Sequence, residues 1–459
     1  MTSPAAAARA LPPSTRTLGV WVLFVVVHTW ITHLGTTRMT GSFQDVALYA
    51  QWVGTGLATG TWPVLDGPWV YPVGALLPML GAELGASWVG ASYVLAWCTL
   101  VTLLDALAVA ALLQARRGRL AATWWLLFVL LLGPVAVGRV DAVVAPLSVV
   151  ALLVVLRHPR TATALLTLAA WIKVAPGAAV LPVLMTARRP WRDVVLPGAL
   201  VCAGVVGAVA ALGGGSHVLS FVQTQERRGL QVEAVAASPW MVAGLFTDAV
   251  GRPLNVELVT YEVDAPGAQA TADVLGAALV LAVLAVTALL WWCRRRAGER
   301  LWTDDALRHD LVLRGTLALA LVLIVTNKVG SPQFIGWLAP PVAAALAVGA
   351  PRWRPTAVTL LGVAAATQWV FPWWYDDVLL GVPLATLVLV ARNVLLVALL
   401  VVTLRHLVRR PDPAPRETGT PGRSPAAGEG STAEGSGAVR GEPGQQVGTG
   451  AAVVDGGVG

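Results

Sequence analysis

The first long polar stretch of the chain reads Gly41-Ser-Phe-Gln-Asp45-Val-Ala-Leu-Tyr49-Ala-Gln-Trp52. It lies between the first two apolar segments that are long enough to cross a membrane, in a connection that covers residues 36–87. Neighbouring helices of a bundle are usually joined by only a few residues. We therefore expect this connection to form the floor of an active site, with Asp45 as its working carboxylate.

The composition is that of a membrane protein. The chain has 459 residues, of which 56% are hydrophobic and 12% are charged, and its mean hydropathy is +0.70. A soluble domain carries about twice this charged fraction. Many separate apolar runs have the length of about 20 residues that a helix needs to span a bilayer. We expect an all-α polytopic membrane protein with about twelve membrane helices, two of them short or broken.

The apolar runs predict the order of the segments. A membrane domain should cover residues 18–405, between an N-terminal flank, 1–17, and a Gly/Pro/Ser-rich tail, 406–459, that we expect to be disordered. Residues 161–186 should enter and leave the membrane as two short helices that break at Lys173-Val-Ala-Pro176, which is tolerated where other segments cover the break. The other helices are expected over 18–35, 88–113, 120–137, 142–156, 194–212, 271–293, 311–326, 334–349, 356–371 and 382–404.

The basic residues predict the orientation. Two of the 32 are lysines, so 30 are arginines, and these cluster in short runs between apolar segments. The loops on one side hold about 20 arginines and those on the other about 5, which is the positive-inside pattern and not that of a nucleic-acid binder. Both termini should be cytoplasmic in a multi-pass protein of the plasma membrane. The two long loops, 36–87 and 213–270, should be extracytoplasmic, away from ATP and nucleotide sugars.

The first loop should begin with an amphipathic helix, followed by an interfacial helix at about 74–84. Asp45, Tyr49 and Trp52 share one side of the first helix, where a carboxylate beside two rings suits a sugar, because its C–H face stacks on aromatic rings and its hydroxyls bond the acid. Alternatively, Ser42-Phe-Gln-Asp45 is a capping box in which Asp45 only supports the helix start. The opposite, apolar stripe is expected to consist of Val46, Ala50, Val53 and Leu57.

Two other polar motifs suit an anion. Arg227-Arg228-Gly-Leu-Gln231-Val-Glu233 lies in the second long loop, where arginines are rare, and the forked guanidinium matches a phosphate. Asn327-Lys328-Val-Gly-Ser331-Pro332-Gln333 lies where an apolar helix breaks, as Lys173 does, and charges at membrane depth are usually functional. The alternatives are a salt bridge of the arginines with Glu226 or Glu233, an ion pair of Lys173 with a buried acid, and snorkelling of Lys328.

The remaining ionisable residues within apolar segments have simpler interpretations. Asp105, Arg314 and Arg392 are expected to form structural ion pairs. His28 and His33 lie near the loop and either donate to a phosphate or sugar or are packed inside. The cysteines Cys98, Cys202 and Cys293 have the spacing of neither a metal site nor a disulfide framework.

Three segments together resemble a known family, the actinobacterial polyprenyl-phosphate-mannose-dependent alpha-(1→2)-mannosyltransferases of glycosyltransferase family 87, in the GT-C class. The resemblance covers about residues 18–405. It departs at Tyr71-Pro72-Val73, where such proteins often have a second proline. The segments are Asp45-Val-Ala-Leu-Tyr49, Arg228-Gly-Leu-Gln231-Val-Glu233-Ala234 and Asn327-Lys328-Val-Gly-Ser331-Pro332-Gln333-Phe334-Ile-Gly-Trp337.

The resemblance implies a GT-C-like fold and an inverting transfer from a lipid donor. The donor would be a polyprenyl-phosphate-linked sugar in the lipid bilayer, and the acceptor a glycolipid or lipoglycan, with Asp45 as the general base. No metal ion is then required, although a loop carboxylate could hold a divalent one. The donor phosphate would be bound by Arg228, Lys328, Arg227 and Lys173. The sugar or acceptor would be bound by Tyr49, Trp52, Gln231, Glu233, Gln333 and His28.

Two alternatives stay open at this point. A polyprenyl-phosphate-arabinose donor keeps the chemistry and changes the sugar. A transporter or lipid flippase with about twelve helices fits the topology, but it calls for acids at mid-membrane, where Asp105 is the one candidate, and for internal repeats, which the sequence does not show.

Overall fold

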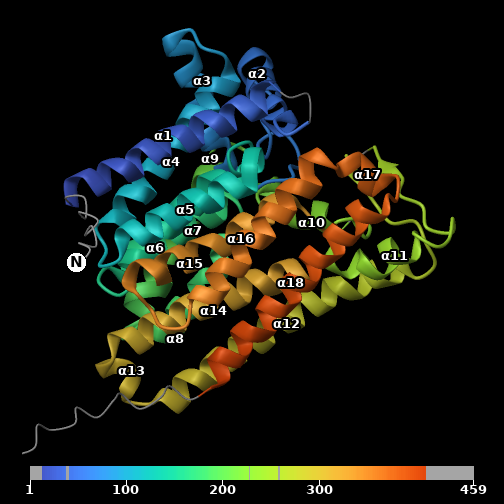
Figure 1. The fold of residues 1–459 in the computed structure, drawn as a ribbon. Helices are drawn as coiled ribbons and strands as arrows, with labels where there is room; N and C mark the ends of the chain where they lie inside the picture. Colours follow the sequence, from blue (N-terminus) through green and yellow to red (C-terminus); the bar gives the residue numbers. More distant parts are fainter. Residues whose placement is uncertain (1–12, 38–40, 227, 257–258, 410–459) are drawn as a thin grey trace, which may run out of the picture. The chain divides into compact units, whose positions relative to one another are not determined.

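The computed structural model describes residues 13–37, 41–226, 228–256 and 259–409, and these are mainly helical. The N-terminal flank up to residue 12 and the tail from residue 410 lie outside the described residues. Figure 1 shows the helices of the described part of the chain.

Six described helices are long and apolar enough to cross a membrane. Two of these spans include a short segment of another helix type. The 3-10 helix η2 (Gly133–Ala136) extends α5, and the π-helix η4 (Trp191–Val195) precedes α9. The six are α1 (Pro13–Thr37), α4 (Tyr93–Leu113), α5 (Gly118–Leu132), α9 (Leu196–Ala211), α12 (Ala268–Ala297) and α18 (Pro383–Val408).

Shorter helices complete the interior. The apolar ones are α3 (Leu76–Val89) after η1 (Val73–Ala75), α6 (Asp141–Val154), α8 (Val180–Thr186) after η3 (Ala175–Ala179), and α15 (Ala339–Val348) after η7 (Pro332–Leu338). The others of the bundle are α7 (Pro159–Ile172), α14 (Asp305–Val325) and α16 (Arg354–Gln368), which continues into η8 (Trp369–Trp373). The small elements are α2 (Gln44–Thr59), η5 (Gly215–His217), α10 (Ser220–Glu226), η6 (Val235–Ala237), α11 (Ser238–Ala243), α13 (Arg300–Thr303), α17 (Tyr375–Leu379) and the antiparallel pair β1 (Leu254–Asn255) and β2 (Thr260–Tyr261).

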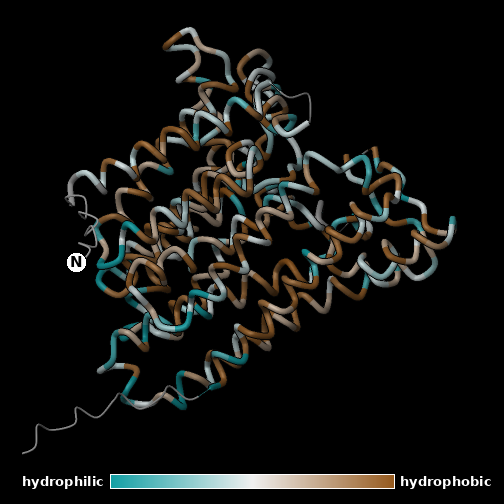
Figure 2. Tube along the Cα trace, in the orientation of Figure 1, coloured by the Kyte–Doolittle hydropathy of each residue, from teal (hydrophilic) through white to brown (hydrophobic). Residues whose placement is uncertain are grey.

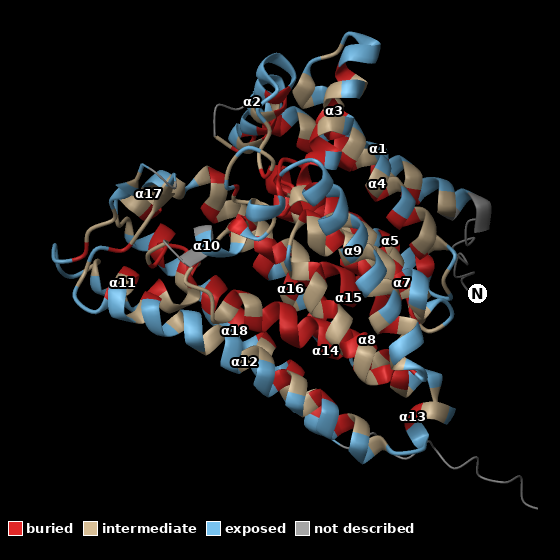
Figure 3. Ribbon diagram, turned by 180° about the vertical axis from the view of Figure 1, so that it is seen from behind, coloured by how far each residue is buried: buried red, intermediate tan, exposed pale blue. Residues whose placement is uncertain are grey.

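The burial pattern separates interior from peripheral helices. Helices α14 and α15 are buried along almost their whole length, and α15 packs on α5 and α6. By contrast, only 11% of the apolar span of α12 and of α9 is buried. Figure 2 shows that α12 is strongly hydrophobic, and Figure 3 shows how much of its surface is exposed. An exposed apolar helix of this length requires lipid as its solvent, so the chain is a helical membrane protein.

The structure confirms the predicted helical segments, with shifted ends. The predicted second helix begins at Tyr93 instead of at residue 88, because Gly90 adopts the left-handed conformation that ends α3 and Ser92 then caps α4 by accepting from Leu95 N–H. The break near Lys173 is also confirmed: α7 ends at Ile172, and η3 begins at Ala175. The count of twelve membrane helices remains a prediction.

The predicted faces of the first-loop helix are wrong at Leu57, which was expected in the apolar stripe, and at Tyr49, which was expected on the opposite side. Helix α2 buries Val46, Tyr49 and Val53, whereas Leu57 is exposed. The helix has therefore turned Tyr49 inward, because the interior beneath it is aromatic and offers the phenol a backbone hydrogen bond. The helix expected at about 74–84 is confirmed as α3, and its position at the membrane interface stays a prediction.

Candidate active site

Asp45 lies in the first turn of α2 and forms an ion pair with Arg139. The N-cap of α2 is Phe43, which makes no side-chain capping bond, so the capping-box alternative does not describe this helix start. The Asp45 side chain is 30% exposed, whereas the Arg139 side chain is 9% exposed. An accessible carboxylate is thus held against a buried guanidinium.

A glycine makes this ion pair possible. Arg139 follows η2, and the preceding residue, Gly138, lies so close to Phe43 that a Cβ atom there would overlap the Phe43 ring. The loop after η2 can therefore approach the start of α2 only with glycine at this position. On the far side of the guanidinium, the Phe371 ring centroid lies 5.7 Å from Cζ of Arg139.

A group of aromatic side chains lies beneath Asp45. Tyr49 is fully buried, and its hydroxyl accepts a hydrogen bond from Val140 N–H at 3.2 Å. Its ring centroid lies 6.0 Å from that of Trp52 and 6.3 Å from that of Tyr71. Trp52 and Tyr71 are only partly buried, so they offer a ring surface near Asp45.

A second ion pair adjoins the first. Lys173 Nζ lies 3.6 Å from a carboxylate oxygen of Asp141 and 4.8 Å from the Tyr71 ring centroid. The Trp337 indole N–H donates to the other Asp141 oxygen at 2.7 Å. Asp141 is buried, so Lys173 forms the ion pair with a buried acid that was one of the two interpretations of this lysine. Of the two carboxylates, Asp45 is the accessible one.

Arg228 brings a further positive charge to the same region. Burial lowers the pKa of its guanidinium, and electrostatic interactions with Tyr71, Glu262 and Asp45 oppose that shift, which places Arg228 within electrostatic reach of Asp45. Its Nε atom is buried and has no hydrogen-bond partner in the described part of the chain. Gly229 N–H is fixed by Glu262 at 3.0 Å, which anchors the loop beside Arg228. We call Asp45, Arg139, Asp141, Lys173 and Arg228 the site cluster.

The two other motifs pack backbone against backbone. Gln231 N–H donates to the Lys328 carbonyl at 3.0 Å, and Gly330 N–H donates to the Gln231 side-chain oxygen at 3.1 Å. Gly330 lies against the backbone of Glu233 and Ala234 so closely that a Cβ atom has no room. The segments 228–234 and 327–333, far apart in sequence, therefore form one structural unit next to the site cluster.

The comparison with protein families identifies the chain. The sequence model of glycosyltransferase family 87 matches residues 69–307, a little more than half of the chain. The chain belongs to glycosyltransferase family 87. No curated protein and no solved structure matches it. This family 87 protein is therefore a membrane glycosyltransferase. The matched range contains Arg139, Asp141, Lys173 and Arg228 but begins after Asp45.

Several residues that were predicted to bind a ligand or to form ion pairs have partners in the protein interior. His28 Nε2 lies 2.9 Å from Asp105, within the membrane-spanning part of the bundle. Glu233 is buried and pairs with Arg392 at 2.8 Å. Arg314 pairs with Asp310 at 2.7 Å, so the predicted structural ion pairs of Arg314 and Arg392 are confirmed, whereas Asp105 contacts a histidine.

Two other predicted phosphate or sugar ligands lie near the site cluster. Gln333 lines a small cavity between Asp105 and Asp141, next to the site cluster. Lys328 is partly buried on the unit that its motif forms with the Gln231 segment. Arg227 lies outside the described residues.

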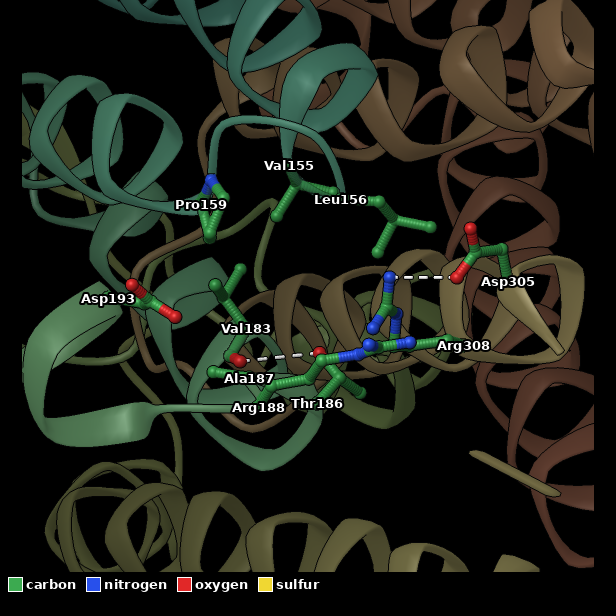
Figure 4. A pocket seen from close by; sticks show the side chains of 10 residues that line it. All are labelled: Val155, Leu156, Pro159, Val183, Thr186, Ala187, Arg188, Asp193, Asp305 and Arg308. Atoms are coloured by element: carbon green, nitrogen blue, oxygen red, sulfur yellow. Dashed lines mark hydrogen bonds and ion pairs between the residues drawn. The ribbon is translucent and has the colours of Figure 1, made fainter. Parts of the chain in front are cut away.

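A cavity lies apart from these groups. It has a volume of about 330 Å³, lies where α6 and α8 end and α14 begins, and has no lining residue in the site cluster (Figure 4). Its charged walls are occupied by internal contacts: Arg308 pairs with Asp305 at 2.8 Å, and Asp193 pairs with Arg160 at 3.1 Å. Within the described ranges no three metal-ligating side chains lie together.

Two members of the site cluster, Arg139 and Asp141, were not among the predicted site residues. A signal was present, because Gly138-Arg139-Val-Asp141 puts one of the few arginines of the arginine-poor side beside an acid. Their roles became visible only when the fold brought this loop to the start of α2, about a hundred residues earlier in the chain.

Proposed function

We propose that this family 87 glycosyltransferase moves a mannosyl group from a polyprenyl-phosphate donor to a hydroxyl of a glycolipid or lipoglycan acceptor. The reaction inverts the anomeric carbon and takes place on the extracytoplasmic face of the plasma membrane. The observation that carries the proposal is the accessible Asp45 carboxylate among the buried cations of the site cluster. The arginine-poor character of both long loops supports the sidedness.

Asp45 serves as the general base. Its carboxylate takes the proton of the acceptor hydroxyl while that oxygen attacks the anomeric carbon of the donor. The bond between this carbon and the phosphate oxygen breaks, and the polyprenyl phosphate leaves with the bonding electrons. Asp45 suits this part because it is the exposed acid of the site cluster, whereas Asp141 is enclosed by Lys173 and Trp337.

The leaving group needs positive charge, not a proton, because a lipid phosphate is already a stable anion. Arg228 and Lys173 lie within electrostatic reach of Asp45 and provide this charge, and preorganised cations in a partly dehydrated site stabilise a developing phosphate. Trp52 and Tyr71 provide the rings against which the sugar packs. No step requires a metal ion.

The test is a transfer assay with the full-length protein in vesicles. Radiolabelled polyprenyl-phosphate-mannose and a phosphatidylinositol-mannoside acceptor are supplied to the unmodified protein and to Asp45→Asn. We expect Asp45→Asn to transfer at a rate about 10²–10⁴-fold lower, since it keeps the shape and loses the base. The matched control is Asp66→Asn, in the same loop, because Asp66 accepts a hydrogen bond from Trp62 N–H at 2.7 Å and Asn can still accept it.

The outcomes separate the alternatives. Equal rates for the unmodified protein and Asp45→Asn would remove Asp45 as the base. Transfer of arabinose but not mannose from the matching lipid phosphate would change the donor and keep the mechanism. Transport of a labelled solute or lipid without transfer of either sugar would replace the proposal by the transporter alternative.

A further inference from the structure

Arg139 is the buried residue that contacts the proposed base directly. It pairs with Asp45 through one terminal nitrogen, and its Nε atom is buried with no partner in the described part of the chain. A guanidinium has five N–H donors in a fixed fork, and burial of an unsatisfied donor is costly. The Arg139 side chain is therefore incompletely satisfied by the protein itself.

The cations around Arg139 have hydrogen-bond donors to spare. Arg228, like Arg139, has a buried Nε atom without a partner in the described part of the chain. Glu262 also acts on the charge of Arg228, so the surplus among these residues is one of N–H donors and not of charge. Buried donors are stable only when they are bonded, so the site cluster is suited to receive the oxygens of one anion.

The pairing of Asp45 with Arg139 also conflicts with its proposed role. The guanidinium contacts Oδ1 of Asp45 and so occupies a position that the acceptor hydroxyl needs in order to reach this carboxylate. The position becomes accessible when the guanidinium turns to another anion.

We infer that the donor phosphate competes with Asp45 for Arg139, so that binding of the lipid phosphate releases Asp45 as the base. The inference rests on the proposed function, since it takes the phosphate of the proposed donor as the competing anion. Arg139 would bind a phosphate oxygen through its fork, which suits phosphate better than a single carboxylate contact does. Base activation would then occur only when the donor is in place.

The neighbours of the pair allow this exchange. The tyrosine hydroxyl of Tyr49 is fixed on Val140 N–H, and Tyr71 packs edge-on to the Tyr49 ring. The remaining charges nearby are already paired, Asp141 with Lys173 and Glu233 with Arg392.

The test is a double-mutant cycle on binding of a short-chain polyprenyl phosphate without sugar, measured in nanodiscs. The four proteins are the unmodified chain, Asp45→Asn, Arg139→Gln and the double variant. Exchange predicts that Asp45→Asn binds about tenfold more tightly than the unmodified chain, because the competing carboxylate is gone. It also predicts that adding Arg139→Gln to Asp45→Asn weakens binding by about tenfold or more.

A purely structural Arg139 predicts a different result. In that case Arg139→Gln weakens binding only because it leaves the Asp45 charge unpaired. The same change then has no effect when Asp45 has already been replaced by asparagine. Equal affinity of Asp45→Asn and the double variant therefore overturns the inference. Arg139→Lys keeps the charge and should recover part of the affinity, whereas a misfolded Arg139→Gln protein would be revealed by its melting temperature.

Controls keep this result separate from the proposed function. Arg160→Gln breaks an exposed arginine–aspartate pair with Asp193 and should leave the affinity unchanged. If the unmodified protein transfers sugar but the cycle shows no contribution of Arg139, the inference fails alone. If the unmodified protein neither transfers sugar nor binds polyprenyl phosphate, the proposed function fails and the inference fails with it.

Discussion

Gln231 N–H donates to the carbonyl oxygen of Lys328 at 3.0 Å, which joins two loops that are almost a hundred residues apart in the sequence. The Gln231 side chain repeats the contact by accepting from Gly330 N–H. These bonds hold the loop that carries Arg228 against the loop that carries Lys328. The relationship matters because two cations on mobile loops could not form a preorganised phosphate site.

Gly330→Ala tests this contact. A Cβ atom at residue 330 would overlap the backbone of Glu233 and Ala234, which cannot turn aside as a flexible side chain can. We expect the unfolding free energy to fall by about 1–3 kcal/mol, together with a loss of sugar transfer. Thermal unfolding and the transfer assay measure both effects. The matched control is Gly336→Ala, where nothing lies within 4 Å of the added Cβ atom. Similar behaviour of the two variants would contradict the proposed close packing.

The buried pair of Glu233 and Arg392 provides a second prediction. Arg392 donates to the Glu233 carboxylate at 2.8 Å and to its backbone carbonyl at 3.0 Å, and both side chains are almost fully buried. Glu233→Gln leaves the Arg392 charge unpaired, so we expect a loss of about 3–5 kcal/mol in stability. Chemical denaturation in detergent measures it. If Glu233 acts mainly as a sugar ligand, Glu233→Gln instead keeps its melting temperature and raises the KM for the acceptor.

Asp193→Asn is the comparison variant for that prediction. Its partner, Arg160, has an exposed side chain, and exposed pairs contribute only about 0–1 kcal/mol. The difference in stability between Glu233→Gln and Asp193→Asn therefore measures the effect of burying the charge and not the effect of removing a carboxylate as such.

Much of the helical framework was predictable from the sequence, because apolar runs of membrane length report helices directly. The break after Ile172 was predictable for the same local reason, since Pro176 cannot continue a helix without loss of a hydrogen bond. The inward turn of Tyr49 was not predictable, because it depends on Val140 N–H from a distant loop. Helical periodicity of one segment contains no information about its partner.

The site shows the same division. Asp45 and the arginine and lysine motifs were recognised as local patterns, whereas Arg139 gains its role from a contact across 94 positions of the chain, from residue 45 to residue 139. His28 was predicted as a ligand because it lies near the first loop, and Glu233 because it belongs to a motif that resembles family 87. Their partners, Asp105 and Arg392, lie 77 and 159 positions away in the sequence, so the pairing could not be read from either motif.

Arg228 is expected to govern donor binding. Burial lowers the pKa of its guanidinium, and its Nε atom has no partner among the described residues, so an incoming phosphate would complete its hydrogen bonds. We expect Arg228→Gln to raise the KM for the lipid donor about tenfold or more, and Arg228→Lys to recover only part of this loss, because lysine lacks the fork. Steady-state kinetics with the donor and acceptor varied separately measure the effect.

Arg252→Gln is the control for that experiment. Arg252 is also a loop arginine whose guanidinium pKa is lowered by burial, and it likewise has a buried Nε atom without a partner in the described chain. Its neighbours are Gly244 and Gly381, not the site cluster. A rise in the donor KM of both variants would show that the effect is not specific to Arg228, whereas a rise in the acceptor KM of Arg228→Gln would move this residue to the acceptor side.

Removal of divalent metal ions tests the electrostatics of the whole site cluster. Asp45, its accessible acid, is paired with Arg139, and Asp141 is paired with Lys173. A divalent ion at Asp45 would have to displace this guanidinium and would lie among like charges. We therefore expect sugar transfer to continue unchanged after dialysis against a chelator, with the same dependence on Asp45. Loss of transfer that added magnesium or manganese restores would contradict this prediction and would make Asp45 a metal ligand in place of a free base.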